Sequence, residues 1–204
     1  MKFAWTGTAL AALCLAASAQ AGDASAGAQK AAVCAACHGA SGTSINPEWP
    51  NLAGQHESCI AEQLAHFKNG VRTDPLMSPM AAALTDADMQ DLGAYFARQT
   101  PAGLEADPAI WKAGEKLYRG GDRGEDGNRG LPACIACHGP QGTGNAPAKY
   151  PALRSQHGVY AYNQLKAFAD GTRKTPGNDI MQVVASKLTD EEMRALASYL
   201  QGLR

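Results

Sequence analysis

Two short segments of this 204-residue chain closely repeat each other: CAACHGASGT begins at Cys34 and CIACHGPQGT begins at Cys134. Each holds two cysteines separated by two residues and followed at once by a histidine. The similarity extends further, because LTDADMQDLGAYF at 84–96 corresponds to LTDEEMRALASYL at 188–200. A match that runs through nearly every segment indicates a duplication, and therefore two homologous domains rather than one larger core.

The ends of these domains follow from local composition. The first residues combine a basic start, a short apolar run and an Ala-x-Ala end, which is typical of a cleaved secretory signal peptide. An uncleaved N-terminal anchor is the alternative, although the apolar run is short for a membrane span. A segment with two prolines separates the repeats. The predicted boundaries are 1–21 for the signal peptide, 22–98 for an N-terminal domain, 99–108 for a linker and 109–204 for a C-terminal domain.

Both domains show the periodicity of helices. Thr85 and Thr189 each stand three positions before an acidic residue, at the start of an apolar periodic stretch, as expected at a helix N-terminus. The same periodicity predicts a helix from Glu57 to Asn69, which a glycine follows. Short helices are expected to begin near Ala24 and Ala109. No alternating run predicts a strand, so we expect an all-α fold.

Closely spaced cysteines serve three chemistries. Two zinc-binding pairs usually lie about 15–20 residues apart, far closer than the two pairs in this chain. A thioredoxin-like dithiol needs a βαβ context, which the sequence does not show. Cys-x-x-Cys-His is the signature of covalent haem c attachment, in which the thiols bond the vinyl groups and the histidine binds the iron. The predicted haem attachment residues are Cys34, Cys37, Cys134 and Cys137, and the predicted proximal ligands are His38 and His138.

A methionine is expected as the second axial ligand of each iron. Met77 and Met181 both stand seven residues before the leucine of a Leu-Thr-Asp helix start. Met80 lacks such a counterpart, because Val184 takes its place. A methionine at one position in both repeats, in loops that contain proline or glycine, favours ligation over a core role. Imidazole and thioether together close the coordination of the iron, which then transfers electrons and offers no position to a substrate.

The remaining cysteine and histidines are predicted to have structural roles. Cys59 takes the position of Tyr160 in the other repeat and is expected to be a buried, inert thiol. His56 and His157 belong to a repeated Gln-His pair before a helix, where a surface or capping role is favoured over ligation. His66 has no counterpart and is expected on the exposed side of its helix.

These motifs and their order resemble the cytochrome c4 family, in which two class I cytochrome c domains lie in tandem. The resemblance covers essentially the whole mature chain. It implies a two-lobed helical fold with two haem c groups facing each other across the domain interface. It also implies a periplasmic electron carrier rather than an enzyme. Its implied partners are redox proteins, with a membrane cytochrome complex as donor and a terminal oxidase or other periplasmic redox protein as acceptor.

The resemblance further implies roles for residues around each haem. Pro50 and Pro151 match the proline whose carbonyl accepts the N–H of the proximal histidine, a contact that orients the imidazole. Leu52 and Leu153 match the leucine that packs on the haem. These four residues are therefore expected in the surroundings of the two haem groups.

The resemblance extends to one helix crossing outside the haem surroundings, and one segment of the second domain has no counterpart in the first. Gly27 and Gly114 match the glycine at which the first and last helices of a domain cross, opposite Tyr95 and Tyr199. The segment 121–130 lengthens the second domain before its cysteines and is interpreted as a flexible surface loop.

Charge and hydropathy exclude some classes of function. With 18 basic and 19 acidic residues the chain lacks the excess of positive charge typical of nucleic-acid binding. Residues 22–98 hold four basic and eight acidic side chains, and residues 99–204 hold 13 and 11. This difference in charge between the two halves would orient the protein as it docks on a partner. The alternative is that the charges of the two repeats diverged without a functional role. The mature chain contains no apolar run long enough for a membrane span, so at most peripheral membrane association is expected.

Two other functions stay open. One is a dihaem peroxidase or thiosulfate-oxidising enzyme, in which one haem loses or replaces its methionine. The presence of a methionine at the same position in both repeats disfavours this alternative. The other is a haem subunit that serves one oxidoreductase as its bound electron acceptor.

Overall fold

The computed structural model describes residues 21–204, and over this range the chain forms helices and no β-strand. Two isolated β-bridges are its only extended pairings among these residues. The predicted all-α fold is therefore confirmed. The predicted signal peptide lies outside the described residues except for its last position. Among the helices of residues 21–204, none is long and apolar enough to cross a membrane.

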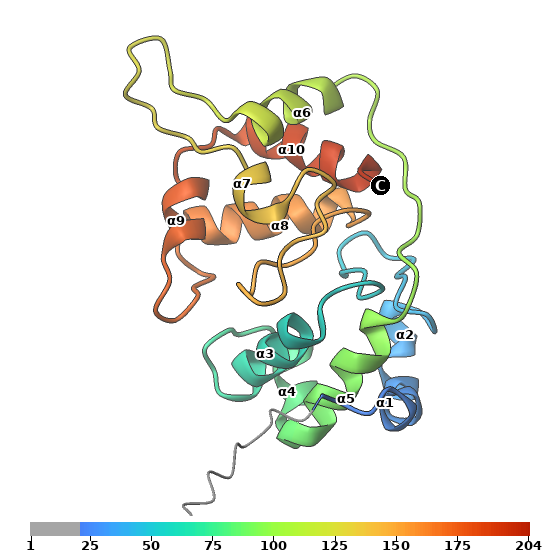
Figure 1. Ribbon diagram of the computed structural model, residues 1–204. Coiled ribbons are helices and arrows are strands. Elements are labelled where there is room, and N and C mark those ends of the chain that lie inside the picture. The colour runs from blue at the N-terminus through green and yellow to red at the C-terminus, as the bar shows by residue number, and fades with distance from the viewer. Residues whose placement is uncertain (1–20) are drawn as a thin grey trace, which may run out of the picture.

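In the described part of the chain, the two halves contain the same series of five α-helices in the same order, and the N-terminal half has one additional 3₁₀ helix (Figure 1). In the N-terminal half these are α1 (Ala24–Lys30), the 3₁₀ helix η1 (Ala31–Val33), α2 (Ala35–His38), α3 (Glu57–Lys68), α4 (Met77–Ala82) and α5 (Asp86–Ala97). In the C-terminal half they are α6 (Trp111–Gly120), α7 (Ile135–His138), α8 (Gly158–Ala169), α9 (Ile180–Ala185) and α10 (Asp190–Gly202). Helices α1 and α3 pack on α5, and their counterparts α6 and α8 pack on α10.

The ends of the main helices follow the sequence signals. Thr85 and Thr189 begin α5 and α10 with complete capping boxes, in which the threonine side chain and the acidic side chain three residues on bond each other's backbone N–H. Glycines with positive φ, +71° at Gly70 and +77° at Gly171, follow α3 and α8. The capping prediction and the predicted helix from residue 57 are thus confirmed.

Two glycines allow the first and last helices of each half to cross at very short distance. A Cβ atom on Gly27 would lie 2.0 Å from the carbonyl oxygen of Asp91 in α5. A Cβ atom on Gly114 would lie 2.0 Å from the carbonyl oxygen of Ala195 in α10. The close helix crossings that the resemblance implied are therefore present in both halves, and at each of them only glycine fits without separating the helices.

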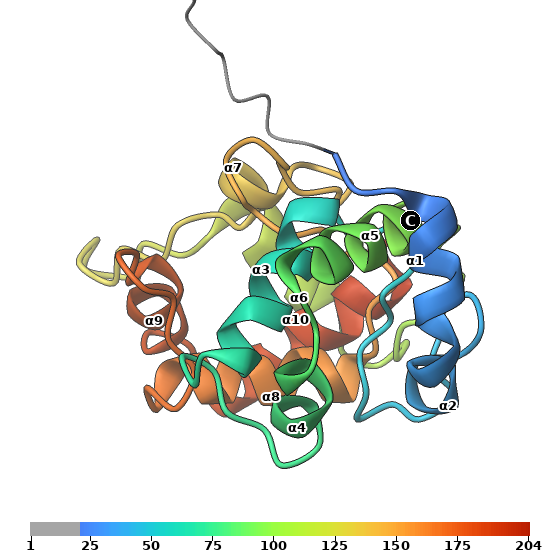
Figure 2. The same cartoon turned by 90° about the horizontal axis from the view of Figure 1, so that it is seen from below.

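The two halves meet through the loops that follow α2 and α7 (Figures 1 and 2). Gln55 bonds both backbone groups of Ala152, donating from Nε2 to the carbonyl (2.9 Å) and accepting the N–H at Oε1 (3.0 Å). Gln156 makes the same two bonds to Asn51, at 3.0 and 2.8 Å. Because these four residues occupy matching repeat positions, the interface has an approximate two-fold symmetry.

Candidate metal centres

Each Cys-x-x-Cys-His segment folds into a single helical turn. In α2 the backbone N–H of His38 donates to the carbonyl of Cys34 at 2.9 Å, and in α7 His138 makes the same bond to Cys134. The first cysteine is the N-cap residue of this turn, and the second cysteine and the histidine are its last two residues. The turn ends at a glycine in both halves, with φ near +75°. The repeated sequence motif is therefore a repeated three-dimensional unit.

The two histidines are held in one orientation by a backbone carbonyl. His38 Nδ1 lies 2.9 Å from the carbonyl oxygen of Pro50, and His138 Nδ1 lies 2.9 Å from that of Pro151. A carbonyl oxygen only accepts, so Nδ1 carries the proton and Nε2 is the nitrogen that can bind a metal. Burial lowers the pKa of both imidazoles and outweighs the opposing effect of the hydrogen bond. Both rings are therefore neutral near pH 7, as metal binding requires.

The thiols have the properties of attachment sites rather than of a redox pair. All four motif cysteines are free, together with Cys59. Burial raises the pKa of the Cys34 thiol, and burial raises that of Cys134 to about 11. A thioredoxin-like pair needs a thiol of lowered pKa. Within residues 21–204 no group of three or more His, Cys, Asp or Glu side chains is placed to hold a metal ion.

Apolar side chains at matching repeat positions pack on the same cores as the motif cysteines. In each half, half-buried residues that include the first motif cysteine pack against the hydrophobic core. Four of these positions are shared by the two halves: Cys34 and Cys134, Leu52 and Leu153, Leu64 and Leu165, Leu84 and Leu188. A covalently bound haem needs two thiols for attachment, a neutral imidazole to bind the iron and an apolar lining for the porphyrin. The residues present therefore fit two haem c groups.

The structure places Met77 and Met181 differently from the sequence prediction. Both were expected in loops, but Met77 is the first residue of α4 and Met181 is the second residue of α9. The turn before each methionine is made in the same way, because the side chains of Asp74 and Asn178 accept the backbone N–H two residues on. Both methionines are half-buried, whereas Met80 is 47% exposed.

Two tyrosines make contacts with the residues after the cysteine turns that the sequence analysis did not predict. Tyr118 of α6 is fully buried and donates from its hydroxyl to the carbonyl of Gly139 at 2.6 Å. In the N-terminal half Tyr95 of α5 donates to the carbonyl of Ala40 at 2.9 Å. The two tyrosines come from helices that are not counterparts, so comparison of the repeats could not have revealed their common role.

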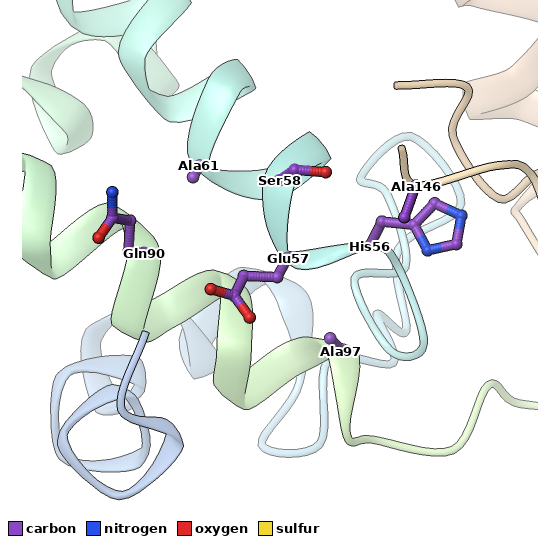
Figure 3. A pocket seen from close by; sticks show the side chains of 7 residues that line it. All are labelled: His56, Glu57, Ser58, Ala61, Gln90, Ala97 and Ala146. Carbon is purple, nitrogen blue, oxygen red and sulfur yellow. The ribbon is translucent and has the colours of Figure 1, made fainter. Parts of the chain in front are cut away.

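The predicted capping role was wrong for both His56 and His157, and the predicted surface role was wrong for His157. Neither side chain caps the helix that follows it. His157 is buried and its Nε2 donates to the carbonyl of Ser44 across the interface, at 2.8 Å. His56 lines a surface pocket beside Glu57 and next to Ala146 of the other half (Figure 3), and its Nε2 is buried without a hydrogen-bond partner among the described residues. The Gln-His pairs therefore belong to the domain interface.

Three further expectations have mixed outcomes. Cys59 is buried as predicted, and burial raises the pKa of its thiol to about 11. His66 is half-buried rather than exposed, because it faces charged side chains of both halves. The segment 121–130 lies on the surface as expected, but it is anchored: Arg129 pairs with Asp122 and with Glu192 of α10. This anchoring argues against a flexible loop.

Comparisons with family models divide the chain in the same way as the helices do. Residues 112–204 match the family described as cytochrome c. Residues 21–96 match the family described as cytochrome C oxidase, cbb3-type, subunit III. Each matched range contains one cysteine motif and one of the two methionines, so each half of the chain corresponds to a cytochrome domain.

Comparisons with whole proteins cover nearly the entire chain. A cytochrome c4 from Pseudomonas aeruginosa is 46% identical over 184 residues, which is 90% of each chain. A protein from Thiomonas intermedia described as a thiosulfate dehydrogenase electron acceptor is 39% identical, over 84% of this chain and 78% of that protein. The crystal structure of reduced recombinant cytochrome c4 from Pseudomonas stutzeri superposes with a TM-score of 0.86 at 44% identity, over 90% of this chain and 100% of that chain.

Proposed function

Because the chain belongs to the cytochrome c4 family and is a dihaem electron-transfer cytochrome, we propose that it carries single electrons between respiratory proteins of the periplasm. The proposed donor is a membrane cytochrome complex, and the proposed acceptor is a terminal oxidase or another periplasmic redox protein. The predicted signal peptide supports the location. The observation that carries the proposal is the duplicated centre, with one cysteine-histidine turn and one methionine at matching positions in each half.

The proposal assigns one pair of axial ligands to each iron. We assign His38 and Met77 to the first iron, and His138 and Met181 to the second. A haem c supplies an iron that alternates between ferric and ferrous states, and so accepts and passes on one electron at a time. Two protein ligands on each iron leave no coordination position for a substrate, which favours a carrier over an enzyme.

The chain's own residues tune these centres. The carbonyls of Pro50 and Pro151 fix the ring orientation of the proximal histidines and increase the electron donation of Nε2. The half-buried leucines that pack on the same cores as the motif cysteines would help to exclude water from a bound haem. Thioether ligation and a dry pocket both raise the reduction potential of a haem iron. The arrangement therefore suits a carrier that takes electrons from a membrane complex and delivers them to a strongly oxidising acceptor.

The optical spectrum of the oxidised protein, with haem counted per chain, tests the ligand assignment. A ferric iron bound to methionine sulfur has a weak long-wavelength band, and we expect this band at full strength for two haems. Met77→Leu should halve it. Met80→Leu is the matched control, because it removes a thioether three residues away, and it should leave the band intact. A half-strength band in the unmodified protein would refute the proposed pair of closed sites.

A second candidate function follows from a relative's description. The Thiomonas intermedia protein, 39% identical, is described as the electron acceptor of thiosulfate dehydrogenase. On this alternative the chain accepts electrons from one enzyme that oxidises thiosulfate, rather than exchanging them with several partners.

Stopped-flow reduction separates the two candidates. The oxidised protein is mixed with thiosulfate, with and without a thiosulfate dehydrogenase. Rapid reduction that requires the dehydrogenase would support the acceptor role. Reduction by a membrane cytochrome complex, together with no response to the dehydrogenase, would support the general carrier. Reduction by thiosulfate alone would indicate that the chain itself is the enzyme, and would refute both.

A further inference from the structure

Two arginines at matching repeat positions meet at the interface between the halves. Arg72 follows α3 and Arg173 follows α8. Each guanidinium stacks on a phenylalanine of its own half, with 4.6 Å from its carbon to the ring centroid, at Phe67 and at Phe168. This repeated packing fixes both charged groups at the same border of the interface.

The two guanidiniums are linked through shared amide oxygens. Gln63 Oε1 accepts from Arg72 at 2.8 Å and from Arg173 at 3.1 Å. Gln164 Oε1 accepts from both arginines at 2.8 Å. Tyr160 adds its hydroxyl as a further acceptor for Arg72, at 3.2 Å. Each arginine therefore bonds both halves, and the pair forms a single unit.

This unit has an excess of positive charge. Within residues 21–204 neither arginine forms a salt bridge, and the acceptors named above are neutral groups. The charges that affect the pKa of the adjacent His66 are those of the two arginines, Lys149 and one carboxylate, Glu62. This carboxylate is itself paired with Lys149 at 2.8 Å. Burial, and then the charge of Arg72, lower the pKa of Arg173 to about 10. Two half-buried cations side by side thus lack a compensating anion among the described residues.

The chemistry of the unit identifies the kind of ligand it fits. A guanidinium has five N–H donors, and Arg72 uses three of them in the hydrogen bonds above while Arg173 uses two. The remaining donors suit a planar oxyanion, which guanidinium groups bind with two parallel hydrogen bonds. Paired, half-buried positive charge also favours an anion over a neutral ligand. A carboxylate or another oxyanion is the expected occupant.

The position of the unit indicates which carboxylate this is. Leu64 and Leu165, each next to one of the shared glutamines, belong to the apolar lining of the two haem sites. In the first site, Pro50 holds the proximal histidine, and the next residue, Asn51, bonds the other half. The surroundings of the haem therefore reach the interface. Each haem c carries two propionate carboxylates, on the porphyrin edge away from its thioether links.

We propose that Arg72 and Arg173 form one shared site for haem propionate carboxylates at the domain interface. Because each arginine is bonded to both halves, each one stabilises the charge of both haems. The arginines are positioning and charge-compensating residues and do not ligate iron. This inference rests on the presence of two haem groups and does not depend on which partners exchange electrons with them.

The test measures both reduction potentials by spectroelectrochemical titration of the dihaem protein. Arg72→Gln and Arg173→Gln remove one charge each, and loss of a nearby positive charge favours the ferric state. Each single variant should lower both potentials, and change the ratio of reduced to oxidised haem at fixed potential by about tenfold, the effect of one unit charge at a partly buried site. Both potentials should also become more dependent on pH near neutrality, since the propionates lose their partner.

Matched variants control for charge and for folding. Arg119→Gln makes the same change on α6, far from the interface (Figure 1), and should leave both potentials unchanged. Arg72→Lys keeps the charge and loses the planar guanidinium, so it should lower both reduction potentials by a smaller amount. This variant tests the inference even if Arg72→Gln fails to fold.

Three outcomes would overturn the inference. Unchanged potentials in both interface variants would show that the arginines only pack. A shift confined to one haem would show that the site is not shared. Potentials of the unmodified protein that change with phosphate concentration at constant ionic strength would show that a dissolved oxyanion occupies the site. The methionine band is recorded for every variant, so a failure of the proposed iron ligands is distinguished from a failure of this inference.

Discussion

The closest helix crossing in the C-terminal half gives a sharp test of the packing. Gly114→Ala would place a Cβ atom 2.0 Å from the carbonyl oxygen of Ala195 and 2.9 Å from the backbone nitrogen of Leu196. Ordinary van der Waals contacts begin at 3.4 Å, so α6 and α10 would have to separate by more than an ångström. Both groups are backbone, and neither can rotate away.

The expected loss of stability follows from two opposing effects. Overpacking of this kind costs about 3 kcal/mol, near the upper end of the range for such insertions. Replacing glycine by alanine inside a helix returns about 1 kcal/mol. The net destabilisation is therefore about 2 kcal/mol, which lowers the Tm of a domain of this size by roughly 10 °C.

Thermal unfolding of the dihaem protein, followed by far-ultraviolet circular dichroism, measures this loss. Gly120→Ala is the matched control, because it makes the same substitution in the same helix where nothing lies within 4 Å of the added Cβ. It should leave the Tm unchanged or raise it slightly. A Tm for Gly114→Ala equal to or above that of Gly120→Ala would refute the close crossing of the helices.

Three further predictions concern other contacts. Arg129→Ala should destabilise the C-terminal half by roughly 1 kcal/mol at neutral pH. Because Arg129 lowers the pKa of Glu192, the difference in stability should shrink as acid protonates Glu192. Denaturant titrations at a series of pH values measure this difference. His157→Leu should cost about 1–3 kcal/mol in calorimetry, because it leaves the carbonyl of Ser44 unpaired, whereas His56→Leu should be nearly neutral. Cys59 should react slowly with iodoacetamide in the native protein and rapidly after unfolding in guanidinium.

Local signals made most of the helices and the cysteine turns predictable from the sequence. A capping box acts within four residues, and a helical period within about two turns, so the starts of α5 and α10 were correctly placed. The haem motif is equally local, since five consecutive residues define it. The duplication strengthened each of these predictions, because every signal was observed twice.

The interface could not be predicted in this way, because its contacts join residues about a hundred positions apart. The side chain of His157 bonds a carbonyl 113 residues earlier in the chain, and nothing in its own neighbourhood indicates this. The same holds for Gln55 and Gln156, whose partners are backbone groups of the other half. Polar residues repeated before a helix suggested solvent or capping roles, and tertiary contact overrode that local preference.

Several differences between the repeats lie at the interface and make the contacts of the two halves unequal. The Tyr160 hydroxyl oxygen accepts a hydrogen bond from Arg72, whereas Cys59, a buried free thiol, stands at the matching position of the other repeat. His157 bonds across the interface and His56 does not. These departures from two-fold symmetry place unequal surroundings beside two otherwise matching metal centres. Unequal surroundings produce unequal reduction potentials. An electron would then reside preferentially on one haem, which gives the molecule a direction that an exact duplication would lack.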